Sequence, residues 1–202
     1  MKILAFSIFF GMLAACSTPI QSRKPETGGL VYLPSSSVSD FEQEWYASHL
    51  FAMREPILSP FGKPADYFAL RLLYLPTWGR PISFRYEVHG TQAVRRAVML
   101  SGDGGYEPGR IKIDHTSSPT PQQIANLMST LDESGYWDLA EKDDVMGFDG
   151  SQLVLETIRD GQHRVLVRWT PEYEPDARNL TKLVSLYAAE FKGDGFWSGA
   201  SE

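Results

Sequence analysis

The chain has 202 residues, a formal net charge of −6, 43% hydrophobic residues and 22% charged residues. This composition is ordinary for a globular protein, and the length suits one domain with a substantial hydrophobic core. The acidic balance argues against a nucleic-acid partner, because phosphate binding needs clustered Lys and Arg. Since the sequence has a single cysteine, an intramolecular disulfide is excluded.

The chain begins with a short apolar leader that ends at the single cysteine. Lys2 gives a positive start, the next eleven residues carry no charge, and the small residues Ala14 and Ala15 precede Cys16. These are the three parts of a secretory signal peptide. A transmembrane helix needs about 20 apolar residues, and this run is too short for one. We therefore expect residues 1–15 to be a signal peptide.

The tetrad Leu13-Ala14-Ala15-Cys16 resembles the lipobox of bacterial lipoproteins. The resemblance implies that Cys16 carries fatty-acyl chains such as palmitate. These chains would hold the protein on a membrane of the cell envelope. In this class an Asp after the cysteine tends to cause inner-membrane retention. Because Ser17 stands there, the resemblance implies the outer membrane, facing the periplasm. The alternative is an ordinary signal peptide followed by a free thiol.

Residues 16–38 are dominated by Ser, Thr, Pro and Gly. Such a composition buries too little apolar surface to order itself, so a flexible tether is expected here. The short apolar run 30–33 could dock on the domain. A single domain is expected over 39–193, and a tail over 194–202.

Local signals predict the first elements of this domain. Ser39 and Glu42 have the spacing of a capping box and start a helix that Pro56 stops. Alternation of apolar and polar residues is typical of half-buried antiparallel strands. Strands are predicted on this basis over 67–75, 82–88, 93–100 and 110–114. The Gly-rich segment 102–109 is expected to be a wide hairpin loop whose glycines supply positive φ.

The second half of the domain has the clearest signals. Thr120, Pro121 and Gln123 predict the start of a helix, and Gly135 fits the left-handed position after its end. Asp160-Gly161 favours a type I′ turn between strands over 152–158 and 163–169, and a last helix is predicted over 176–192. The order predicts an α+β fold, with an antiparallel sheet of about six strands and roughly three helices packed on one face.

Exposed aromatic and Arg side chains are typical of recognition surfaces. The binding candidates on this criterion are Trp78, Tyr106, Trp169, Arg71, Arg85 and Arg168. Trp78 lies in a Pro-rich loop and Tyr106 in the Gly-rich loop, so these two are the candidates for exposed contacts. Trp169 could instead pack in the core. The three arginines could line an anion pocket, or could cap a sheet face with their aliphatic stems.

Glu156 and His163 are the one candidate catalytic pair. In a hairpin with a two-residue turn they would be diagonal neighbours on one sheet face, where such a pair could do acid–base work. An ion pair that orders the hairpin is the alternative. The sequence has no Gly-x-Ser-x-Gly motif and its histidines are scattered, so we predict no metal site and no cofactor.

Several short stretches carry a second resemblance: WYASHL at 45–50, LPTWGRPI at 75–82, GGYEPG at 104–109, DGSQ at 149–152 and RWTP at 168–171. Together they resemble, across residues 45–190, a group of bacterial proteins to which no activity is assigned. The resemblance implies a shared fold and no particular chemistry.

These observations predict a cell-envelope protein held on the membrane by lipid on Cys16. We expect a non-enzymatic binding module whose partner is a protein or an envelope polymer, and an immunity-type inhibitor of an exported toxin is one version. The alternative is an envelope hydrolase that uses Glu156 and His163. The sequence makes no prediction of oligomeric state.

Overall fold

The structure is a computed structural model that describes residues 27, 29–142, 145 and 147–171. The predicted signal peptide, Cys16, much of the predicted tether, the predicted helix 176–192 and the predicted tail lie outside the described residues. Within the described part, the chain forms an antiparallel sheet of six strands with two α-helices, which confirms the predicted α+β class. No helix in this part has the length and apolar character that a membrane span requires.

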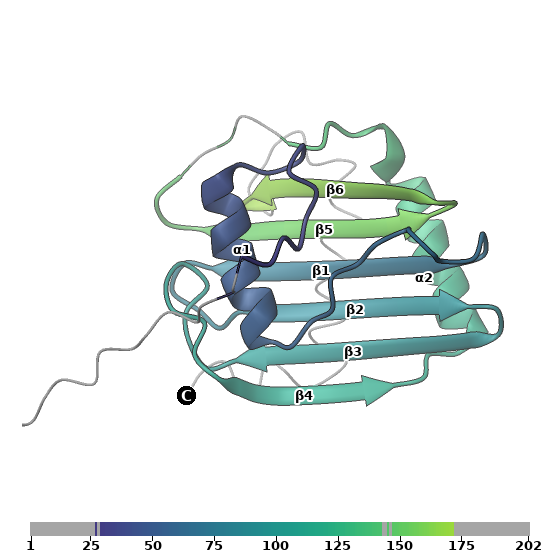
Figure 1. Cartoon of the computed structure of the whole chain (residues 1–202), viewed down its shortest axis with the longest axis horizontal. Helices are drawn as coiled ribbons and strands as arrows, with labels where there is room; N and C mark the ends of the chain where they lie inside the picture. Colours follow the sequence, from purple (N-terminus) through teal and green to yellow (C-terminus); the bar gives the residue numbers. More distant parts are fainter. Residues whose placement is uncertain (1–26, 28, 143–144, 146, 172–202) are drawn as a thin grey trace, which may run out of the picture.

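The elements follow in the order α1 (Asp40–Ala52), β1 (Phe68–Pro76), β2 (Ile82–His89), β3 (Gln92–Leu100), β4 (Ile111–Ser117), α2 (Pro121–Glu133), the 3₁₀-helix η1 (Tyr136–Asp138), β5 (Ser151–Arg159) and β6 (Gln162–Trp169). The strand order in the sheet is β4-β3-β2-β1-β5-β6. The hairpin β5–β6 therefore joins the sheet beside β1, and α2 lies on the connection from the edge strand β4 to β5 (Figure 1).

Short-range signals in the sequence define the ends of several elements. Both capping boxes are present, with Ser39 and Thr120 as the N-cap residues of α1 and α2. Gly135 adopts the predicted left-handed conformation, with a φ of 69°. Asp160 and Gly161 both have positive φ, as a type I′ turn requires. These four predictions are confirmed.

The two helices cover opposite faces of the sheet, so the prediction that the helices pack on one face was wrong. In Figure 1, α1 lies in front of the sheet and α2, drawn fainter, lies behind it. The reason is visible in β1, whose neighbouring residues Leu72 and Leu73 are both buried, one in each of two separate cores. A strand that is apolar on both sides needs a covering layer on both sides.

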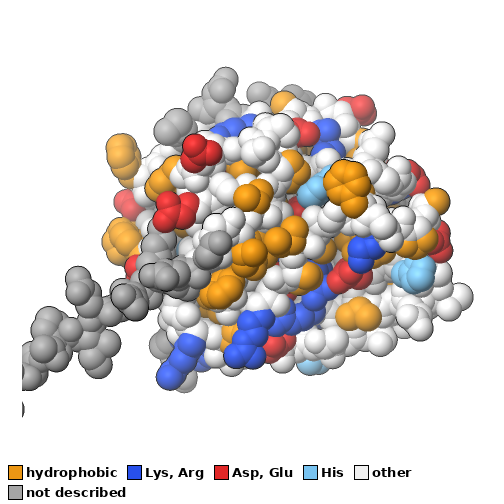
Figure 2. Space-filling model, viewed as in Figure 1, with side chains coloured by type: hydrophobic (Ala, Val, Ile, Leu, Met, Phe, Trp, Pro, Cys, Tyr) orange, Lys and Arg blue, Asp and Glu red, His pale blue; other side chains and the backbone are white. Residues whose placement is uncertain are grey.

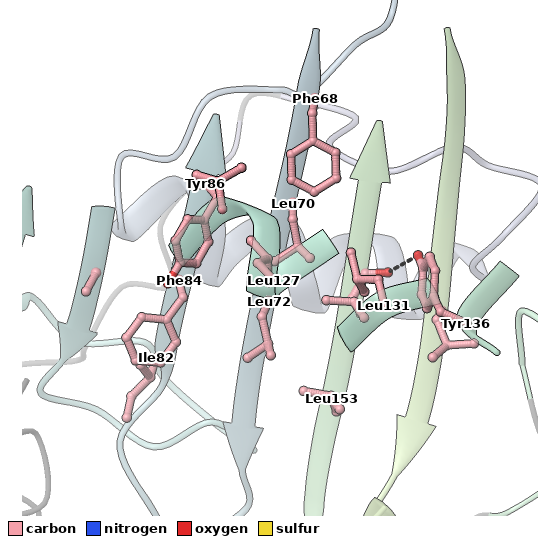
Figure 3. Close-up of a cluster of buried hydrophobic side chains, with 14 of the residues drawn as sticks. Phe68, Leu70, Leu72, Ile82, Phe84, Tyr86, Leu127, Leu131, Tyr136 and Leu153 are labelled. Carbon is pink, nitrogen blue, oxygen red and sulfur yellow. Dashed lines mark hydrogen bonds between the residues drawn. The ribbon is translucent and has the colours of Figure 1, made fainter. Parts of the chain in front are cut away.

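The core under α2 gathers aromatic and aliphatic side chains from the central strands, and Figure 3 shows them pointing toward the helix. Leu127 and Leu131 of α2 pack there with residues of β1, β2 and β5. Tyr136 of η1 closes this core, and its hydroxyl lies 3.0 Å from the Thr157 hydroxyl. Burial raises the pKa of Tyr136 to about 12, and the hydrogen bond with Thr157 acts in the opposite direction.

The core under α1 includes the chain segment that precedes the helix. Tyr32 and Leu33 are buried in this core, whereas Leu30 and Val31 are exposed, so only the second half of the apolar run 30–33 docks on the sheet. The Gln43 side chain of α1 fixes this segment: it accepts from the Tyr32 and Leu33 amides, each at 3.2 Å, and donates to the Leu33 carbonyl at 2.7 Å.

Candidate functional site

One end of the sheet carries the exposed aromatic side chains that the sequence singled out. Because the strands are antiparallel, the β1–β2 loop (77–81), the β3–β4 loop (101–110) and the segment before β5 (147–150) lie at the same end, on the left in Figure 1. We call these three segments the loop end. β6 also finishes there, at Trp169.

Trp78 and Tyr106 come from different loops and meet at the loop end. Their ring centroids are 5.0 Å apart with planes tilted by 40°, and their exposed fractions are 69% and 54%. The Trp78 indole N–H donates to Asp149 Oδ1 at 2.9 Å, so all three segments of the loop end take part in one arrangement. The structure thus exposes both predicted aromatic residues and brings them together.

Backbone hydrogen bonds fix the loops that carry these rings. The Gly104 amide donates to the Gly79 carbonyl at 2.9 Å, and the Thr77 amide donates to the Gly150 carbonyl at 2.8 Å. A Cβ on Gly104 would overlap the Leu75 backbone, so glycine is needed there for close approach. In the Gly-rich loop, positive φ is confined to Gly109, which corrects the prediction that the glycines of this loop serve that purpose.

A cavity of about 470 Å³ lies beside the loop end, at the start of α1. It is lined by Ser39, Phe41, Glu42, Trp45, Lys142, Val145, Gly147, Gln152, Val167 and Trp169. Trp45 connects it to the loop end, because its indole N–H donates to the Gly104 carbonyl at 2.7 Å. Gly147 lies so close to the Trp169 ring that a Cβ there would overlap the indole.

One ion pair lines this cavity. Lys142 Nζ donates to both carboxylate oxygens of Glu42 at 2.7 Å. Burial by itself raises the pKa of Glu42, but the hydrogen bonds from Lys142 and Ser39 outweigh it and hold the pKa below its usual value. The cavity therefore combines aromatic walls with a charged pair, as small-ligand and side-chain pockets commonly do.

Three arginines form a row across the sheet on the α1 face. Arg71, Arg85 and Arg96 are direct cross-strand neighbours on β1, β2 and β3, and we call them the arginine row. Like charges in such positions repel unless carboxylates separate them. Glu55, just after α1, supplies that charge: it accepts from Arg85 Nε at 2.7 Å and from Arg96 Nη1 at 2.6 Å.

The arginine row is therefore saturated by the protein itself. Arg71 donates to Glu156 and, at 2.7 Å, to the Pro56 carbonyl, and Arg85 donates to Glu87. Arg71 and Arg85 line neither the cavity beside α1 nor a second one near Trp137. Their guanidinium groups tie the chain after α1 to the sheet.

Glu156 and His163 meet as their hairpin register predicted. His163 Nε2 lies 2.7 Å from Glu156 Oε1 on the α1 face of the sheet. Glu156 is 1% exposed and also receives the Arg71 guanidinium, so its charge is balanced inside the protein. Within the described residues, the His163 side chain has no hydrogen bond to a serine or threonine that could act as a nucleophile.

The remaining candidates have different surroundings. Arg168 is buried and donates to the backbone carbonyls of Ala140 at 2.6 Å and Val167 at 2.7 Å. Trp169 is half-buried in the cavity wall, so it is neither a core residue nor a fully exposed contact residue.

Sequence reasoning missed Glu55 and Lys142. The signal for Glu55 was its place beside Pro56, which breaks the helix and lets the carboxylate turn toward the sheet.

No protein-family model matches the chain, and no curated protein matches it. Among the residues that the structure describes, no group of three or more His, Cys, Asp or Glu side chains is placed to hold a metal ion. The loop end offers aromatic contact, hydrogen bonding and charge, through Trp78, Tyr106 and Asp149.

Proposed function

We propose that the protein is a lipid-anchored binding module of the bacterial cell envelope and that it binds a partner through the loop end. The observation that supports this most is the Trp78–Tyr106 pair, two large rings that remain exposed on an otherwise folded domain. Each such ring buries about 150–250 Å² in an interface, and Trp and Tyr dominate the binding energy of many interfaces.

The rigidity of the loop end favours binding. Trp78 is held by Asp149, and its loop is held by the hydrogen bond between Gly79 and Gly104. Ordering a side chain on association costs about 0.5–1.5 kcal/mol, and rings that are already ordered avoid part of that cost. The neighbouring cavity, walled by Trp45 and Trp169, offers room for a side chain or short segment of the partner.

The membrane attachment in this proposal rests on the resemblance of residues 13–16 to a lipobox. Lipid on Cys16 would hold the domain at a membrane surface, and Ser17 favours the outer membrane with the domain facing the periplasm. The test is to replace Cys16 with Ala and to fractionate the cells. We expect the variant to leave the membrane fraction. A variant that still sediments with membranes would overturn the anchor.

The binding role is tested by crosslinking the full-length lipidated protein in its native envelope and purifying it. Trp78→Ala combined with Tyr106→Ala should remove a species that the native protein captures. Phe61→Ala is the matched control, because Phe61 is 90% exposed in a loop outside the loop end. Capture that is unchanged by the double substitution would contradict the proposal.

The hydrolase alternative has less support. The 2.7 Å contact between Glu156 and His163 is compatible with acid–base chemistry, but the same buried carboxylate also accepts from the Arg71 guanidinium. A structural contact among Arg71, Glu156 and His163, which joins β1, β5 and β6, accounts for all three side chains. The catalytic role of Glu156 and His163 stays a prediction.

A further inference from the structure

Asp149 adds a charge to the aromatic pair. Its Oδ1 accepts the Trp78 indole N–H at 2.9 Å, and the side chain is exposed. Within the described residues, no Lys, Arg or His forms a salt bridge with Asp149. In the part of the chain that the structure describes, the loop end therefore presents a carboxylate without a salt-bridge partner, directly beside the edge of an exposed indole.

This combination matches the chemistry of a cation. The face of an aromatic ring carries partial negative charge and attracts an ammonium or guanidinium group within about 6 Å of its centroid. Trp binds cations best among the aromatic residues, and Tyr106 supplies a second ring 5.0 Å away. Because Asp149 Oδ1 contacts the Trp78 indole, the other oxygen of this carboxylate also lies near the ring. A guanidinium stacked on Trp78 could donate a hydrogen bond to that second oxygen.

The protein uses the same type of contact internally. The Arg95 guanidinium lies 5.1 Å from the centroid of Phe84, and the Arg159 guanidinium lies 5.4 Å from that of Trp137. Arg159 also donates to Asp132 at 2.8 Å, and Asp132 accepts from the Trp137 indole at 2.7 Å. Trp137, Asp132 and Arg159 thus form a complete set of indole, carboxylate and guanidinium. At the loop end, Trp78 and Asp149 repeat the indole and the carboxylate, and none of the described residues supplies a guanidinium to this pair.

Charge on the whole chain favours the same class of partner. The net charge of −6 attracts cationic molecules and raises their rate of encounter. Figure 2 shows Asp and Glu side chains among hydrophobic ones in the upper part of the end where the loops lie, and Lys and Arg side chains in the lower part of that end.

We infer that Trp78, Tyr106 and Asp149 form a site for a cationic side chain of a partner protein, with Arg preferred over Lys. The preference follows from the planar guanidinium, which stacks on a ring and donates to a carboxylate at the same time. The inference deepens the proposed function and rests on it, since it names the partner chemistry of the same loop end.

The test uses the full-length protein in detergent and three probes in isothermal titration calorimetry: tetra-arginine, tetra-lysine and the uncharged oligosaccharide chitotetraose. Tetra-arginine should bind more tightly than tetra-lysine, and its affinity should fall as salt rises from about 50 mM to about 500 mM. Tighter binding of chitotetraose than of tetra-arginine would overturn the inference in favour of a glycan site. Absence of measurable tetra-arginine binding up to about 10 mM would also overturn it.

Two substitutions assign the binding to this site. Asp149→Asn keeps an acceptor for the Trp78 indole but removes the charge, and Trp78→Ala removes the ring. Each should weaken tetra-arginine binding about three- to thirtyfold. Asp160→Asn is the control, because Asp160 is an exposed carboxylate in the β5–β6 turn. Equal affinities for the native protein and Asp149→Asn would refute the inference.

The crosslinking experiment separates this inference from the proposed function. If Trp78→Ala with Tyr106→Ala abolishes capture while Asp149→Asn leaves it intact, the binding module stands and the cation site fails. If neither variant changes capture, both fail.

Discussion

Glu55 is the residue whose replacement tests the structure most directly. It lies three residues after the end of α1 (Asp40–Ala52), its side chain is inaccessible to solvent, and it faces the arginine row on the sheet. It accepts from Arg85 Nε at 2.7 Å and from Arg96 Nη1 at 2.6 Å, and its Oε2 lies 3.8 Å from Arg71 Nη1. One carboxylate therefore contacts three cations on three adjacent strands.

Glu55→Gln keeps the size of the side chain and removes its charge. Removing one partner of a buried ion pair costs about 3–5 kcal/mol, because the other charge stays buried without compensation. Here Glu156, Glu87 and Asp114 still compensate parts of the arginine row, so we expect the lower end of this range, about 3 kcal/mol. A loss of that size lowers the melting temperature by about 6–12 °C for a domain of this length.

The assay is urea unfolding of the full-length protein at neutral pH, followed by far-ultraviolet circular dichroism. The midpoint should fall with little change in slope, since the surface exposed on unfolding is unchanged. Asp160→Asn is the control, and its free energy of unfolding should stay within about 0.5 kcal/mol of the native value. A loss below about 1 kcal/mol for Glu55→Gln would refute the argument that this carboxylate holds the arginine row together.

Three further predictions concern other parts of the fold. Burial raises the pKa of Tyr136 from its usual 10 to about 12, so the stability that the neutral phenol contributes is complete below pH 10 and is lost as pH rises toward about 12. The urea midpoint of the native protein should fall between these pH values, and the midpoint of Tyr136→Phe should fall less. Gly150→Ala should cost about 1–3 kcal/mol, because the new Cβ overlaps Thr170 Oγ1, and an unchanged urea midpoint would show that the segment before β5 (Ser151–Arg159) can move aside. Thr120→Ala should cost about 1 kcal/mol through loss of the α2 (Pro121–Glu133) cap, while Thr120→Asn should restore most of it in the same assay.

The sequence by itself determined the local features, because each depends on residues only a few positions apart. A Ser or Thr with Glu or Gln three residues later caps a helix wherever that helix packs. Asp160-Gly161 likewise fixes the β5–β6 turn without help from the rest of the chain. The exposure of Trp78 and Tyr106 also followed from their positions in loops rich in Pro and Gly.

The tertiary structure decided which segments meet. Arg71, Arg85 and Arg96 become neighbours only through the registers of β1 with β2 and of β2 with β3, and Glu156 joins them because β5 pairs with β1. The sequence suggested an anion pocket for Arg71 and Arg85, but these pairings give both arginines carboxylate partners inside the protein.

The candidate site depends on the same long-range pairings. Trp78, Tyr106 and Asp149 are far apart in the chain, and the order of antiparallel strands carries all three loops to one end of the sheet. The placement of α1 and α2 on opposite faces was also decided at this level, because β1 is apolar on both sides and each side needs its own cover. Local hydrogen bonds and backbone preferences act over a few residues, whereas strand order and register depend on burying apolar surface from the whole chain.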